Sequence, residues 1–175
     1  MRSLLLALGV FLFCAPAQAH VFIEPDLGFE FGTDKQNYSY TDGTAPKSSS
    51  FSQNGSSYGL TGGYRHQRYF IGAQYEKGMA GHITDISATF GMWIALRVRV
   101  WGSYIFSAKD EVSKGSGYKA GIGFTLNKLF NLNFEYAARS YNEYTATTAS
   151  TLTYSGTTNS FKVFVSIPIP RFGNL

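Results

Sequence analysis

Apolar and polar residues alternate between Tyr118 and Leu126. One face of this segment carries Tyr118, Ala120, Ile122, Phe124 and Leu126, and the other carries Lys119, Gly121, Gly123 and Thr125. Successive side chains of a β-strand point to opposite faces, so a period of two predicts a strand with one apolar and one polar face. The pattern recurs about eight times along the chain, which predicts an all-β fold.

Two kinds of connection separate the predicted strands. We expect strands at about 26–33, 58–65, 69–76, 84–92, 96–106, 118–126, 131–139 and 161–167. The connections after the second, fourth and sixth strands are tight, whereas 34–57 and 142–158 are long polar loops. Bacterial outer-membrane barrels have short periplasmic turns, longer external loops and an even number of strands. The pattern therefore predicts an eight-stranded antiparallel transmembrane up-and-down β-barrel with both termini on the periplasmic side.

Charged residues on the polar faces indicate which face lies inside. Arg97 and Arg99 alternate with valines, and an arginine on the lipid face near the midplane costs about 2 to 4 kcal/mol. We therefore expect both arginines in the barrel interior. The same parity predicts an interior charge network of Glu30, Glu76, Asp85, Arg97, Arg99, Lys119, Glu135, Arg139 and Lys162.

Arg65 has the same parity and joins the bases of this set. The numbers of acids and bases are then near balance, which favours mutual pairing. The interior of an eight-stranded barrel is just wide enough for side chains to fill. We expect paired charges to plug the barrel. The alternative is a narrow pore for ions or small solutes with a basic lining.

The first 19 residues have the features of a signal peptide. Arg2 precedes a short apolar run, and Ala17-Gln18-Ala19 has the small-x-small form of a cleavage site. We expect cleavage after Ala19, which leaves residues 20–175 as the barrel domain. Cys14 is the single cysteine and lies in this leader, so disulfide and thiol chemistry are not expected in the mature chain.

Composition agrees with a membrane barrel better than with the alternatives. Aromatic residues make up 17% of the chain and charged residues only 15%, below the usual quarter for a soluble domain. The net charge of +4 comes from scattered basic residues without a cluster, which argues against a nucleic-acid partner. A soluble secreted barrel or sandwich, with the apolar faces packed inside, is the rival fold.

The region from about Phe22 to Phe172 resembles the small eight-stranded outer-membrane β-barrels of Gram-negative bacteria, the OmpA/OmpX-like type. The resemblance implies a place in the bacterial outer membrane after export, with outer-membrane lipids, lipopolysaccharide and the barrel-assembly machinery as partners. Members commonly end on an aromatic residue that resembles an assembly signal. Here Gly173-Asn174-Leu175 follow Phe172, a departure from that pattern.

An enzyme that modifies lipid, similar to a lipid A deacylase or acyltransferase, is a weaker alternative. It requires a nucleophile with a histidine in reach, and His82 with Asp85 and Ser87 is the best-placed trio. His82 has the opposite strand parity from the other two. No metal or cofactor motif accompanies them, so we expect a barrel that is not an enzyme and has no cofactor.

The long polar loops are the remaining candidates for function. They carry interspersed aromatics, namely Tyr38, Tyr40, Phe51, Tyr144 and Tyr154. Loops on a rigid scaffold are where binding residues collect. We expect a structural role or a surface-interaction role, with an extracellular ligand bound by these loops.

Overall fold

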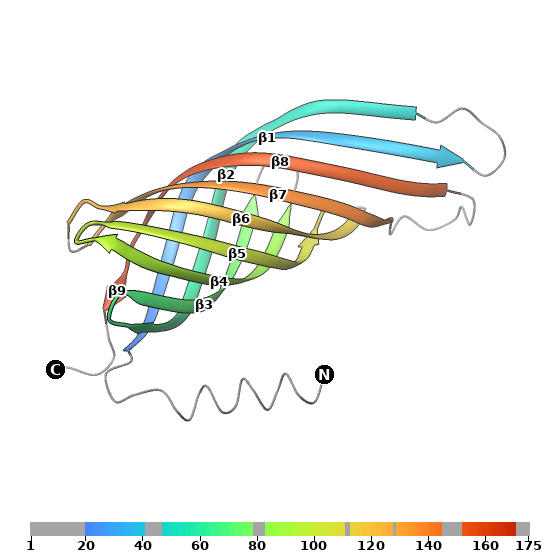
Figure 1. Cartoon of the computed structure of the whole chain (residues 1–175). Helices are drawn as coiled ribbons and strands as arrows, with labels where there is room; N and C mark the ends of the chain where they lie inside the picture. Colours follow the sequence, from blue (N-terminus) through green and yellow to red (C-terminus); the bar gives the residue numbers. More distant parts are fainter. Residues whose placement is uncertain are drawn as a thin grey trace, which may run out of the picture.

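The computed structural model of the protein describes residues 20–40, 47–78, 83–110, 113–127, 129–144 and 152–170. The predicted signal peptide and Phe172 lie outside these residues. Eight long strands and one short strand are formed (Figure 1). They are β1 (His20–Tyr40), β2 (Lys47–His66), β3 (Tyr69–Gly78), β4 (Thr84–Ala95), β5 (Val98–Lys109), β6 (Ser113–Thr125), β7 (Asn131–Tyr144), β8 (Leu152–Ser166) and β9 (Ile169–Pro170).

The eight long strands close into one antiparallel barrel. Each strand from β2 to β8 pairs with the next, and β1 pairs with both β2 and β8. Stepping from partner to partner once round the barrel from Asp26 on β1 ends at Gln36 on the same strand. The strands are thus staggered and tilted, as closure requires. The predicted eight-stranded antiparallel barrel is confirmed.

The barrel is apolar outside and polar inside. Outward side chains such as Leu27, Phe90 and Tyr118 are 65%, 56% and 67% exposed. Inward side chains such as Glu76, Asp85 and Lys119 on the same sheet are buried. This distribution is the inverse of a soluble barrel and is that of a barrel that spans a membrane, so the rival soluble fold is excluded. None of the described residues form a helix that is long and apolar enough to cross a membrane.

The two ends of the barrel differ. At the short-turn end the chain reverses at 67–68, 96–97 and 126–130. Gln67 has a φ of 49°, the left-handed conformation that tight hairpin turns use. In the third turn the Asn127 side-chain oxygen accepts hydrogen bonds from the backbone N–H groups of Leu129 and Phe130 at 2.8 and 2.9 Å.

At the opposite end, the long-strand end, β1, β2 and β8 run beyond the tips of β3 to β6 (Figure 1). Residues 47–56 of β2 pair with β1 on one side, and on the other side the described β2–β3 ladder begins only at Ser57. Residues 152–155 of β8 pair with β1 in the same way, and the β7–β8 ladder reaches only Gly156. We call residues 35–40, 47–56 and 152–155 the projecting sheet.

The prediction of long loops at 34–57 and 142–158 was therefore wrong for most of their length. Within these spans the structure describes β-strand at 34–40, 47–57, 142–144 and 152–158. The expected loop aromatics lie on strands, on β1, β2, β7 and β8. These segments are rich in Ser, Thr and Asn and show no apolar alternation, because a sheet that projects into water has no lipid on its outer face.

The first strand, β1, begins at His20, six residues before the predicted start at Asp26. Pro25 lies inside β1 and has no N–H to donate. It pairs with Leu60 on one side, and on the other its carbonyl accepts a hydrogen bond from Ile167 at 3.0 Å. Residues 167–168 separate β8 from β9, so the missing donor faces a break in the ladder.

Candidate functional site

The barrel interior holds a connected set of charged side chains around Lys119 of β6. Its ammonium lies 2.7 Å from a Glu76 oxygen, 3.2 Å from an Asp85 oxygen and 3.6 Å from a Glu135 oxygen. All four side chains are buried. They come from β3, β4, β6 and β7, so the ammonium links opposite parts of the barrel wall.

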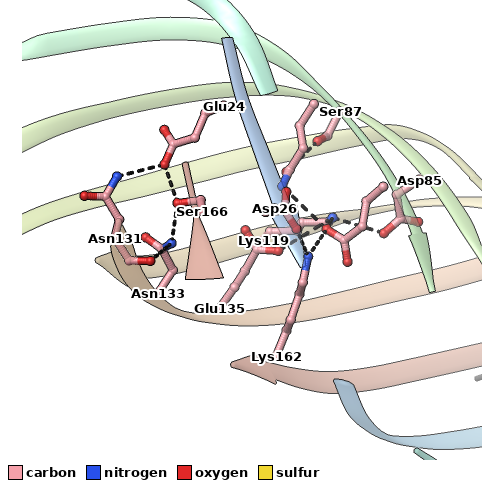
Figure 2. Close-up of polar contacts among 12 residues, drawn as sticks. Glu24, Asp26, Asp85, Ser87, Lys119, Asn131, Asn133, Glu135, Lys162 and Ser166 are labelled. Carbon is pink, nitrogen blue, oxygen red and sulfur yellow. Dashed lines mark hydrogen bonds and ion pairs between the residues drawn. The ribbon is translucent and has the colours of Figure 1, made fainter. Parts of the chain in front are cut away.

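Lys162 of β8 extends this network toward β1. Its ammonium lies 2.6 Å from Asp26 and 3.4 Å from Glu76, and 4.3 Å from the centre of the Phe164 ring. Figure 2 shows Lys119 and Lys162 close to Asp26, Asp85 and Glu135, and both ammonium groups lie within ion-pair distance of one carboxylate, that of Glu76. Glu76 therefore lies between two cations.

Arg139 of β7 forms the interior layer nearer the long-strand end. It binds Asp85 through Nε and Nη2 at 2.9 and 2.7 Å and lies 3.0 Å from Glu30. Ser160 accepts a hydrogen bond from Arg139 at 2.7 Å and donates one to Glu30 at 2.5 Å. The fork geometry of a guanidinium allows this simultaneous recognition of two carboxylates.

A second polar cluster includes Asn131, the first residue of β7, and therefore lies near the short-turn end. Figure 2 shows its Glu24, Asn131, Asn133 and Ser166. Arg99 of β5 binds Glu24 of β1 with both terminal nitrogens, at 2.7 and 2.6 Å. Asn131 donates to Glu24 at 2.9 Å, and Ser166 also donates to Glu24. Asn133 accepts from Arg99 at 2.8 Å and donates to Ser166 at 2.7 Å. The cluster ties β1 to β5, β7 and β8.

Aromatic rings fill the space beside this cluster. Phe70, Trp101 and Phe164 form a buried group, with Phe22 and Trp93 packed against it. Edge-to-face contacts join them, at centroid separations of 5.9 Å for Phe22–Phe70, 5.3 Å for Phe70–Trp93 and 6.2 Å for Trp101–Phe164. The Trp101 N–H donates to Glu135 at 2.8 Å, which connects the aromatic cluster to the ionic network.

Glycines on the inner wall make room for these large groups. A Cβ on Gly121 would lie 2.2 Å from Cζ2 of Trp101, and one on Gly91 would lie 2.3 Å from the Phe70 ring. On Gly59 it would lie 2.5 Å from the Asp26 carboxylate. Glycine fits these positions because a side chain on the adjacent, paired strand occupies the space that a Cβ would take.

The described part of the interior contains a small cavity. A cavity of about 20 Å³ lies between the Arg99 cluster and the Lys162 pair. This volume suits about one water molecule. Its lining includes Glu24, Asp26, Arg99, Trp101 and Phe164.

Eight of the nine predicted network residues lie in the interior, and Arg97 does not. Arg97 lies in the turn at 96–97 and is exposed. The fourth strand continues to Ala95 and the fifth begins at Val98, so strand parity no longer applies to Arg97. Arg65, which we counted with the bases, is also exposed at this end, where its guanidinium lies 4.0 Å above the Trp93 ring.

Sequence reasoning missed three interior acids, Glu24, Asp26 and Asp34, which are all buried on β1. Their parity matches that of Glu30. Asp26 is the first residue of the predicted strand at 26–33, and extending that strand in both directions would have found Glu24 and Asp34. The described interior holds buried acids in excess, not the expected balance. The acids are Glu24, Asp26, Glu30, Asp34, Glu76, Asp85 and Glu135, and the bases are Arg99, Lys119, Arg139 and Lys162.

The alternative catalytic trio does not form a described site. His82 lies outside the described residues. Asp85 is bound to Arg139 and Lys119, and Ser87 is fully buried with its hydroxyl 3.3 Å from Gln74. Within the described ranges, no group of three His, Cys, Asp or Glu side chains is placed to hold a metal ion.

No protein-family model and no curated protein matches the sequence. Among solved structures, Neisserial surface protein A is similar with a TM-score of 0.49 at 14% identity, over 85% of this chain and 97% of that one. Ail, the attachment invasion locus protein of Yersinia pestis, has a TM-score of 0.45 at 10% identity, over 82% and 98%. Outer membrane protein OprG from Pseudomonas aeruginosa has a TM-score of 0.39 at 13% identity, over 88% and 98%. The fold of this chain is defined by its own strand pairing.

Proposed function

We propose that this chain is a non-enzymatic barrel of the bacterial outer membrane that binds an extracellular partner through its projecting sheet. The observation that carries the proposal is the unpaired edge of β2. Residues 47–55 have a ladder partner on the β1 side, and no ladder pairs them on the other side among the described residues. Such an edge presents a row of free N–H and C=O groups, a template for a further strand.

The partner that fits this edge is an extended polypeptide segment. Main-chain hydrogen bonds supply affinity in strand addition, and side chains at alternate positions supply selectivity. The edge is polar, with Ser48, Ser49, Ser50 and Ser52 all exposed, and Phe51 is 39% exposed among them. A polar edge remains soluble outside the membrane while it stays available for pairing.

A peptide library displayed on phage, selected against the barrel in lipid nanodiscs, tests this role. We expect the enriched peptides to slow amide hydrogen exchange across 47–56. We also expect them to fail to bind a variant in which the β1–β2 hairpin is shortened by deletion of 37–52. Peptides that bind the shortened variant equally well would overturn the proposal.

We also propose that the interior is closed to ions and small solutes. Support comes from the buried ion pairs of Lys119 and Arg139, the aromatic cluster and the small volume of the cavity. Planar-bilayer recordings should show no unit conductance for the purified protein. Stable conducting steps would favour the pore instead.

The location and the lack of lipid-modifying activity have their own tests. The protein should fractionate with outer membranes and migrate differently in gels before and after boiling. Recovery as a freely soluble periplasmic protein would contradict the location. Mass analysis of lipid A from cells with and without the protein should give identical species, and a changed acyl pattern would favour the enzyme.

A further inference from the structure

A row of lysines crosses the outer wall of the barrel at its long-strand end. The strand registers place Lys77 of β3 opposite Thr84 of β4, Thr84 opposite Lys109 of β5, and Lys109 opposite Lys114 of β6. Adjacent strands lie about 4.8 Å apart, so three cations occupy a band four strands wide. Lys109 and Lys114 are exposed and Lys77 is half-buried. We call these three residues the lysine row.

The row lies directly beyond the apolar belt. On the same strands, the nearest large outward residues on the short-turn side are Tyr75, Ile86, Phe106 and Tyr118, all exposed. Aromatic residues on the outer wall of a membrane barrel mark the level of the lipid headgroups. The ammonium groups are therefore at headgroup depth.

The other half of the wall carries one described cation beyond its apolar belt, Lys35 of β1, whose register partner on β8 is Thr157. Beyond Tyr58, Phe31 and Phe161, the other outward residues at this level on β2, β1 and β8 bear hydroxyl or amide groups. They are Asn54, Ser56, Thr33, Thr157 and Asn159. The positive charge at this depth is thus concentrated on β3–β6, where three lysines adjoin, whereas β1 carries Lys35 alone.

Two acidic residues lie beside the lysine row, Asp110 next to Lys109 in sequence and Glu143 on β7. The Asp110 carboxylate accepts from the Ser113 backbone N–H and hydroxyl at 2.5 and 2.7 Å in the β5–β6 connection. The register partner of Lys114 on β7 is Glu143, where the row ends.

We propose that the lysine row binds the phosphate groups of an anionic lipid in the leaflet at the long-strand end. The inference rests on the proposed outer-membrane location. Lysine ammonium groups bind phosphate as point charges, and the apolar belt beside the row accepts the acyl chains of the same molecule. The β3–β6 face of the barrel thus binds phosphorylated lipid more tightly than the β1–β2–β8 face, where Lys35 is alone.

Native mass spectrometry of the detergent-solubilised barrel, titrated with bis-phosphorylated lipid A, tests the proposal. A cation near a membrane surface contributes a factor of about five in affinity. The K77Q/K109Q/K114Q variant should therefore bind at least about tenfold more weakly than the wild type. The matched control K35Q/R68Q/R97Q removes the same charge from exposed positions off the row and should stay within about twofold.

Three results would overturn the proposal. One is equal affinity of the row variant and the wild type, and another is equal affinity of the wild type for fully dephosphorylated lipid A. The third is complete displacement of the lipid by millimolar inorganic phosphate, which would assign the row to free phosphate. Membrane fractionation tests the location independently: recovery of the protein outside the outer membrane would contradict the proposed location. Equal lipid affinities of the row variant and the wild type, in a barrel that is correctly located and heat-modifiable, would contradict the lysine-row proposal alone.

Discussion

The two ends of the barrel interior are filled by different chemistry. Toward the short turns, five aromatic rings pack around one bidentate Arg99–Glu24 pair. Toward the long strands, Arg139 and Lys119 each bind more than one buried carboxylate. Buried ion pairs contribute little net stability, yet removing one partner is costly. Aromatic packing instead weakens in proportion to the volume removed. A single substitution at the ionic end should therefore lower the free energy of unfolding sharply, whereas substitutions in the aromatic cluster should lower it in small steps.

The largest loss is expected for Arg139→Ala. The substitution leaves Asp85 and Glu30 buried without their guanidinium, and breaking a buried pair costs about 3 to 5 kcal/mol. Urea unfolding in lipid vesicles, followed by tryptophan fluorescence, measures the free energy. Arg139→Lys keeps the charge and should recover part of the loss, and a cost below about 1 kcal/mol for the alanine variant would contradict the comparison.

Gly121→Ala should have the next largest effect. The added Cβ would lie 2.2 Å from Trp101, and overpacking of this kind costs about 1 to 3 kcal/mol. Gly102→Ala is the matched control on the outer wall, where the nearest atom would lie 3.9 Å away, and should change the same unfolding free energy by no more than about 0.5 kcal/mol. Similar losses in both variants would show that backbone preference, and not the ring, sets the cost.

Phe70→Leu should cost less, below about 1.5 kcal/mol, because a large apolar side chain still fills most of the space in the aromatic cluster. Equilibrium unfolding of this variant beside Arg139→Ala compares the two ends directly. A loss as large as that of the arginine variant would remove the distinction between them.

The smallest effect is expected for Lys35→Gln on the projecting sheet. Lys35 is exposed, and surface substitutions of this kind change stability by at most about 0.5 kcal/mol. The unfolding midpoint and slope should match the wild type. A larger shift would mean that the projecting sheet is energetically coupled to the barrel.

Sequence predicted the parts of the fold that have a membrane on one face and a packed interior on the other. There the alternation at Tyr118–Leu126 determines both the strand and its orientation, and Lys119 is found beside acids as parity requires. In 47–56 both faces of the sheet meet water, so polar residues or glycine occupy every position except that of Phe51, and the alternation disappears. Strand was therefore mistaken for loop in that region.

The interior site was harder to predict at its edges. Arg97 follows the interior parity, but the tight turn at 96–97 has no Gly, Pro or Asn to reveal it. Pro25 interrupts the first strand in sequence and hides Glu24, although the break at 167–168 on the neighbouring strand accommodates the proline. Which acid meets which base depends on the stagger between distant strands, and single-strand periodicity contains no information about that stagger.

The seam between β1 and β8 also bears on how the barrel forms. Ser166 and Glu24, which are 142 positions apart in sequence, are hydrogen-bonded across it, and β1 has no second neighbour until the last long strand arrives. Closure of so long a loop is entropically costly and slow. Until β1 and β8 pair, two sheet edges have no partner strand and the apolar outer wall has no lipid around it. The time to closure, more than the stability of the finished barrel, sets how long this chain must be shielded from aggregation on its way to a membrane.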